Sequence, residues 1–146
     1  MRIGVGNDHS STDLKFVIKE YLESKGHEVV NYGTDSHEAF DYPLAGESVA
    51  NAIINKEVDC GVCICGTGIG ISIACNKVKG IRAAVCSEPV SAALAKEHNN
   101  AQIICFGARI VGVNMAKAIV DAWLDAEFGG ERHQRRINML HEIESK

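Results

Sequence analysis

The chain of 146 residues is poor in proline, in aromatic residues and in long apolar runs. It contains two prolines and one tryptophan, and aromatic side chains make up 5% of it. No apolar run approaches the ~20 residues of a membrane-spanning helix, so the sequence predicts no membrane span. The N-terminal residues also lack the apolar stretch of a secretory signal peptide, and we therefore expect a cytoplasmic protein.

An excess of positive charge is also missing. The formal net charge is −4 at pH 7, which argues against a general nucleic-acid-binding surface. Positive charge gathers in one place only, the segment "RHQRR" at residues 132–136. Such a segment is either a solvated helix face or a binding site for an anion, and composition does not separate the two.

The six cysteines do not have the spacing of a metal site. Cys60 and Cys63 form a C-x₂-C pair and Cys65 follows, but a structural zinc site needs a second pair of ligands. The other cysteines stand singly inside apolar runs: Cys75, Cys86 and Cys105. We therefore expect no metal and no cofactor. For every cysteine except Cys65 we expect a reduced, buried thiol.

Apolar runs alternate with helical patterns from one end of the chain to the other. The patterns predict strands at residues 2–6, 27–33, 60–65, 81–87 and 101–107. A helix is expected after each strand, and a last helix places Ile137, Leu140 and Ile143 on one side. Five strand–helix alternations predict an α/β fold with a five-stranded parallel sheet and helices on both faces. No linker or repeat interrupts residues 1–146, so we expect one domain.

Polar and reactive side chains follow several of the predicted strands. In open parallel sheets, ligands bind at the carboxyl ends of the strands. The residues expected at that edge are Asp8 and His9, Cys65 to Gly70, Ser87 and Glu88, and Gly107 to Arg109. This gathering is the first indication of function in the sequence.

The stretch "CGTGIG", residues 65–70, places a thiol directly before a glycine-rich turn. It is neither a P-loop nor a dinucleotide-binding fingerprint, because the glycine spacing and the lysine of those motifs are missing. Several backbone amides can turn inward there at a helix N-terminus and bind a phosphate, a carboxylate or an oxyanion. Beside them the thiolate of Cys65 is favoured, so Cys65 is a candidate base or nucleophile. The alternative is a buried cysteine before an ordinary tight turn.

His98, in "EHNNA", comes at the end of a predicted helix. It could simply bind the last carbonyls of that helix. Taken together with Asp8, His9, Cys65 and the basic segment, it indicates acid–base chemistry on a phosphorylated sugar. These residues alone do not specify which reaction is catalysed.

The motifs together resemble the ribose-5-phosphate isomerase B family, whose relatives include allose-6-phosphate and galactose-6-phosphate isomerases. The resemblance rests on "NDH", "DYP", "ICGTGIGISIACNKVKGIRAAVCSE", "EHNNA", "FGARIVG" and "GGERHQRRI", in this order over essentially the whole chain. It implies a Rossmann-like three-layer sandwich. It also implies a metal-free, cofactor-free aldose–ketose isomerase that works through a cis-enediolate.

The resemblance also implies roles for individual residues. Cys65 would be the base that moves the proton between C1 and C2, supported by the hydroxyl of Thr67. His98 would open the sugar ring, with Asp8 nearby. The amides that would hold the enediolate oxygen are those of Gly66, Gly68, Ile69 and Gly70. The residues that would bind the substrate are His9, Arg109, Arg132 and Arg136 at the phosphate, and Tyr42 and Asn99 at the sugar.

Members of the family are dimers or tetramers whose sites are shared between subunits. By this resemblance His98, Asn99 and Arg109 would come from the partner chain. The implied reaction interconverts ribose 5-phosphate and ribulose 5-phosphate, in the pentose phosphate pathway. The alternative is the same chemistry on a six-carbon aldose 6-phosphate, because residues beside the pocket depart from the family pattern: Asn7, Ser10, Ser11 and Asn100.

Two alternative hypotheses place the protein in other functional classes. A nucleotide- or flavin-binding module would have the same layers, but the motifs that bind such ligands are missing. A thiol redox sensor would use Cys60, Cys63 and Cys65. Of these, Cys63 and Cys65 face the same side of the predicted strand.

Overall fold

The computed structural model describes residues 1–146, and five strands form its single sheet. The strands are β1 (Arg2–Asn7), β2 (Glu28–Asn31), β3 (Cys60–Cys65), β4 (Ala83–Val85) and β5 (Ile103–Gly107). The helices are α1 (Thr12–Ser24), α2 (Tyr42–Ile54), α3 (Ile69–Asn76), α4 (Pro89–Asn99), α5 (Val113–Asp125) and α6 (Arg132–Glu144), with one 3₁₀ turn at His9–Ser11. None of these helices combines the length and the hydropathy needed to cross a bilayer.

All strand pairs are parallel, and the order across the sheet is β2-β1-β3-β5-β4. Strands β3 and β5 lie inside the sheet and are buried along their whole length, which explains their uninterrupted apolar sequences. The edge strand β4 is only 3 residues long, shorter than the predicted 81–87. Just before β4, the Arg82 amide donates to Gln102 Oε1. At the first residue of β4, the Asn76 side chain accepts from the amide and donates to the carbonyl of Ala83.

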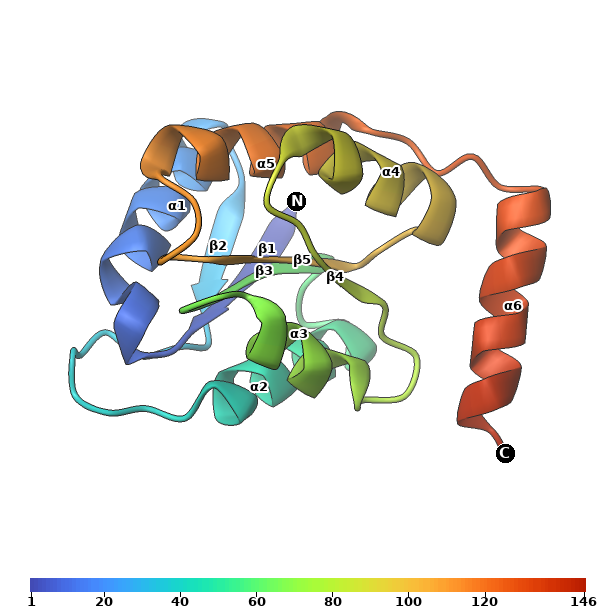
Figure 1. The fold of residues 1–146 in the computed structure, drawn as a ribbon, viewed down its shortest axis with the longest axis horizontal. Helices are drawn as coiled ribbons and strands as arrows, with labels where there is room; N and C mark the ends of the chain where they lie inside the picture. The colour runs from blue at the N-terminus through green and yellow to red at the C-terminus, as the bar shows by residue number, and fades with distance from the viewer.

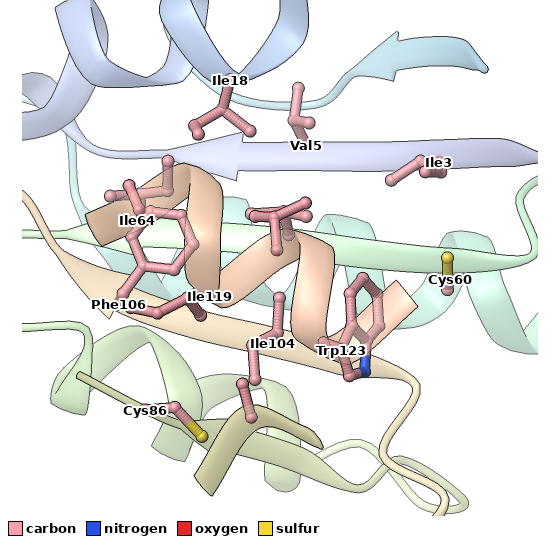
Figure 2. Close-up of a cluster of buried hydrophobic side chains, with 14 of the residues drawn as sticks. Ile3, Val5, Ile18, Cys60, Ile64, Cys86, Ile104, Phe106, Ile119 and Trp123 are labelled. Carbon is pink, nitrogen blue, oxygen red and sulfur yellow. The ribbon is translucent and has the colours of Figure 1, made fainter. Parts of the chain in front are cut away.

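Helices cover both faces of the sheet (Figure 1). On one face α1, α4 and α5 enclose the larger apolar cluster, in which Phe106, Ile119 and Trp123 are fully or almost fully buried (Figure 2). On the other face α2 and α3 enclose a smaller cluster. There α2 comes so close to β3 that a Cβ at Gly61 would lie 2.4 Å from Val49 Cγ1. The predicted three-layer α/β sandwich is confirmed.

Helix α6 does not join either layer. Figure 1 shows it standing at one side of the molecule, beyond the C-terminal end of α4. Of its predicted apolar stripe only Ile137 is buried, whereas Leu140 and Ile143 are exposed. The predicted stripe therefore packs against the rest of the chain only at Ile137, because residues 126–131 lead α6 away from the sheet.

The connections give the sheet a switch point between β1 and β3. From β1 the chain crosses to β2 on one side, and from β3 it passes to β4 on the other. The segments that follow β1 and β3 therefore diverge and leave a crevice at the carboxyl ends of the two strands. Asp8 follows β1 and Gly66 follows β3 directly at this crevice.

Candidate active site

A cavity of about 470 Å³ opens at this switch point. It is lined by Asp8, His9, Ser10, Tyr42, Cys65, Gly66, Thr67, Ile69, Gly70 and Arg109. These residues come from the ends of β1, β3 and β5 and from the first turns of α2 and α3. The structure thus brings together most of the predicted residues that follow the strands.

Cys65 ends β3, and its thiol faces the start of α3. The Gly68 amide donates a hydrogen bond to Cys65 Sγ at 3.2 Å. Gly68 has a φ of +79°, and a Cβ at this position would lie 2.6 Å from the Phe106 carbonyl carbon. Only glycine fits this turn. The turn points one amide and the positive end of a helix dipole at the sulfur.

The other amides of the turn are of two kinds. The Ile69 amide donates to Thr67 Oγ1 at 3.2 Å. The amides of Gly66, Thr67 and Gly70 have no acceptor within the chain. The predicted oxyanion hole of Gly66, Gly68, Ile69 and Gly70 thus contains two amides that donate to side chains of the same turn, those of Gly68 and Ile69. The free donors are those of Gly66 and Gly70, together with the Thr67 amide, which sequence reasoning missed.

The ring of His9 is held by the backbone of Phe40. The Phe40 amide nitrogen lies 3.0 Å from His9 Nδ1, and the Phe40 carbonyl oxygen lies 3.2 Å from it. Because an amide nitrogen always carries its proton, Nδ1 accepts this bond and the ring proton is on Nε2. The Nε2–H of His9 is left free to donate to an anion in the cavity.

The segment that carries Phe40 is tied down by two buried side chains. Lys15, whose side chain is fully buried, donates from Nζ to the Thr34 carbonyl at 2.9 Å and to Asp35 at 2.6 Å. Asn7 Nδ2 donates to the same Thr34 carbonyl at 3.0 Å. Burying a charge or an amide destabilises the fold unless the group is hydrogen-bonded. Lys15 and Asn7 therefore hold the Thr34 carbonyl in place, and this part of the loop is anchored beside β1.

Tyr42 and Arg109 complete the walls of the cavity. A Cβ at Gly70 would lie 2.6 Å from Tyr42 Cζ, so the tyrosine ring packs directly on the first turn of α3. The Arg109 amide donates to the Gly66 carbonyl at 3.0 Å, and its side chain runs alongside Gly66. Both residues therefore reach the cavity from the chain that also supplies Cys65.

The remaining predicted residues form a second cavity of about 450 Å³ between α4 and α6. It contains His98, Asn99, Arg132, His133 and Arg136. The rings of His98 and His133 stack with centroids 4.5 Å apart and planes at 16°. Desolvation, together with the positive charges of His98, Arg132 and Arg136, lowers the pKa of His133 below 6.5. This cavity is therefore a concentrated positive site suited to a phosphate.

The two cavities lie at opposite ends of the strands: the first at their carboxyl ends, the second near their amino ends. Helix α4 begins after the carboxyl end of β4 and returns to the amino end of β5, where His98 and Asn99 lie. The four steps between the first and the last of the five residues of β5 place its two ends about 13 Å apart, at ~3.3 Å per step. Within one chain His98 cannot reach Cys65. Arg109, expected to come from the partner with His98, instead lies beside Cys65, because it directly follows the carboxyl end of β5.

Sequence reasoning gave no role to Ser10 and only a loose one to His133. Ser10 lines the first cavity and bonds Asp8 through both its amide and its hydroxyl. The "D-x-S" spacing of Asp8 and Ser10 is the available signal, since an aspartate commonly bonds the backbone two residues on. No sequence signal predicts the stacking of His133 on His98.

The cysteines do not form one cluster. Cys60 lies in the larger apolar cluster, whereas Cys63 and Cys65 lie in the smaller one. The redox interpretation built on all three is therefore wrong in its grouping, although Cys63 and Cys65 do face the same side. Burial raises the pKa of Cys60 and of Cys86 to about 11. No group of three or more His, Cys, Asp or Glu side chains is placed to hold a metal ion.

Residues 3–140 match the model of the Ribose/Galactose Isomerase family. The chain is 50% identical over 145 residues to "Ribose-5-phosphate isomerase B" of Escherichia coli (strain K12), covering 99% of this chain and 97% of that protein.

Its structure is also similar to solved ones. With "Ribose-5-Phosphate Isomerase B" of Clostridium thermocellum the TM-score is 0.98 at 50% identity, over 99% of this chain and 98% of that one. With the Mycoplasma genitalium "Ribose-5-phosphate Isomerase B", solved with bound ribulose-5-phosphate, the TM-score is 0.94 at 40% identity, over 99% of this chain and 97% of that one. The chain therefore belongs to the Ribose/Galactose Isomerase family.

Proposed function

We propose that this isomerase interconverts ribose 5-phosphate and ribulose 5-phosphate with Cys65 as the base, and that residues 1–146 act as one domain. The observation that carries the proposal is the 3.2 Å hydrogen bond from the Gly68 amide to Cys65 Sγ, beside three amides without an acceptor. The sulfur that would act as the base and the amides that would hold the oxyanion thus line one cavity. Because amides can stabilise the developing oxyanion, we include no metal or cofactor.

In the proposed reaction Cys65 takes the proton from C2 of the open-chain aldose and returns it to C1. The proton on O2 moves to O1, which completes the change from aldose to ketose. The negative charge of the cis-enediolate is held by the amides of Gly66, Thr67 and Gly70. Thr67 accepts the Ile69 amide at Oγ1, so its own hydroxyl proton remains free to act beside the thiolate.

We propose that a complete site needs two copies of the chain. One copy supplies Cys65, Asp8 and Arg109. A second copy supplies the cavity that contains His98, Asn99, Arg132 and Arg136. The separation of the two cavities within one chain supports this division. In it, the partner's His98 opens the ring, and the partner's arginines bind the phosphate together with His9 and Arg109 of the first copy.

The smallest assembly with complete sites is a homodimer, and a tetramer would contain the same pairs. We place this protein in the cytoplasm, in the pentose phosphate pathway, where ribose 5-phosphate is available. The relative solved with ribulose-5-phosphate supports a pentose substrate. The family description also includes galactose, so an aldose 6-phosphate is the competing substrate.

Kinetics on a panel of aldose phosphates tests the proposal. We expect the highest kcat/KM for ribose 5-phosphate, above allose 6-phosphate and galactose 6-phosphate. Cys65→Ala should abolish exchange of the C2 proton with solvent while the protein still binds inorganic phosphate. Arg136→Ala should mainly raise KM. A clear preference for a hexose phosphate would overturn the substrate, and near-normal turnover by Cys65→Ala would overturn the base.

A further inference from the structure

Ser10 makes two hydrogen bonds to one oxygen of Asp8. Its amide donates to Asp8 Oδ1 at 3.0 Å, and its hydroxyl donates to the same oxygen at 2.6 Å. Bonds from neutral donors to a carboxylate are among the stronger hydrogen bonds in proteins. Oδ1 is therefore firmly held by the residue two positions further along the chain.

The neighbouring Ser11 has a different role. Its hydroxyl lies 2.7 Å from the Ile64 carbonyl oxygen and 3.2 Å from Asp8 Oδ1. A hydroxyl has one proton to donate, and the shorter contact takes it to Ile64. Ser11 thus ties the turn to β3 next to Cys65, and the hydroxyl that binds Asp8 is the one on Ser10.

The second carboxylate oxygen, Asp8 Oδ2, accepts no hydrogen bond within the chain. Asp8 lines the cavity that contains Cys65, and so does Ser10. The last torsion of an aspartate is broad and roughly two-fold, so an unheld carboxylate would turn in place. With Oδ1 held by Ser10, the oxygen left to accept a hydroxyl group from a ligand is Oδ2.

We propose that Ser10 is a positioning residue for the isomerisation: it holds Asp8 so that Oδ2 accepts a hydroxyl group of the bound sugar phosphate. This inference rests on the proposed function. Ser10 acts through Asp8, and the group that touches the substrate is the carboxylate.

A double-mutant cycle tests this role. Ser10→Ala removes the hydroxyl but keeps the amide donor, and we expect kcat/KM for ribose 5-phosphate to fall on the order of tenfold, as for one lost hydrogen bond to a charged group. Ser10→Thr, which keeps a hydroxyl, should recover most of the loss. In an Asp8→Ala background, Ser10→Ala should cause no further loss. For variants too slow for the kinetic assay, the rate of deuterium exchange at C2 of the substrate is measured by NMR.

Ser24→Ala is the matched control, because Ser24 also makes a 2.6 Å hydroxyl bond, to the Tyr21 carbonyl outside the cavity. It should leave kcat/KM unchanged. All variants are assayed well below their Tm, so that a lower stability of Ser10→Ala is not mistaken for a lower activity. An equal loss from Ser10→Ala with and without Asp8, or no loss at all, would overturn the inference. The ¹³Cγ signal of Asp8 in the substrate-free protein gives a readout without turnover. It should move in Ser10→Ala and not in Ser24→Ala, and an unmoved signal also counts against Ser10.

Absence of activity in the unmodified protein would overturn the proposed function instead. The two failures are therefore distinguishable.

Discussion

At the scale of single residues, the glycine turn after β3 divides its amides between two tasks. The Gly68 amide faces the sulfur of Cys65, whereas the amides of Gly66 and Gly70 remain without an acceptor. Sequence spacing identified the thiol and the turn, because a reactive side chain at the end of a buried strand is conspicuous. It could not assign the amides, because the direction of each N–H depends on the left-handed conformation at Gly68.

The histidines give a prediction at the same scale. His133 has a lowered pKa because desolvation and the positive charges around it oppose protonation. Inorganic phosphate bound between Arg132 and Arg136 would offset those charges, so the pKa of His133 should rise on binding. NMR titration of the histidine rings, with and without phosphate, measures the shift.

His27 is the internal control for that titration. Its pKa is also lowered, by burial and then by the N-terminal amine and Lys25, but it lies before β2. Phosphate should leave it unchanged. A rise at both histidines would indicate a general ionic-strength effect. No rise at His133 would contradict phosphate binding in this cavity.

The sign of the stability effect follows from the same shift. The pKa of His133 is lower in the folded chain than in the unfolded one, so the unfolded chain takes up the proton first as the pH falls below 6.5. The free energy of unfolding therefore decreases as the pH is lowered and this histidine becomes protonated. The effect is confined to pH values below about 6.5, the ordinary histidine pKa.

At the scale of elements, Arg82 connects α4 and α6. Its guanidinium donates to the carbonyls of Asn99 at 2.8 Å and Asn100 at 3.1 Å, and Nη1 lies 2.9 Å from His141 Nε2. The bonds satisfy carbonyls at the C-terminal end of α4, where a positive charge is favourable. One side chain therefore orients the helix that carries Arg132 and Arg136 against the helix that carries His98.

Arg82→Ala should separate these two helices. We expect the free energy of unfolding to fall by about 1–3 kcal/mol, the cost of lost bonds to a charged group, and KM for the sugar phosphate to rise more than kcat falls. Urea denaturation and steady-state kinetics measure the two effects. Arg2→Ala, which removes an exposed pair with Glu28, is the control and should change neither. A purely structural Arg82 would lower stability and leave KM unchanged.

At the scale of the whole molecule, the two cavities predict complementation between inactive chains. In a dimer of one Cys65→Ala chain and one His98→Ala chain, one of the two shared sites contains both original residues and the other contains neither. Purified through two different tags, this heterodimer should have about half the activity of the unmodified dimer. The coupled isomerase assay measures it, with each mutant homodimer as the baseline.

Cys65→Ala combined with Arg109→Ala is the matched pair that should not complement. Both residues lie in the same cavity of one chain, so each shared site would lack one of them. Recovery by this second pair, or failure of the first, would contradict the proposed division of the site between chains.

The strand and helix order, the parallel sheet and the cluster around Cys65 follow from the sequence alone. Alternating apolar patterns are local, and parallel strands bring the residues that follow them to one edge. Tertiary structure decided what depends on direction and distance. It showed that α4 carries His98 to the far edge of the sheet, that Arg109 stays with Cys65, and that α6 leaves Leu140 and Ile143 exposed. Such facts depend on how segments distant in the chain pack together, which no local pattern contains.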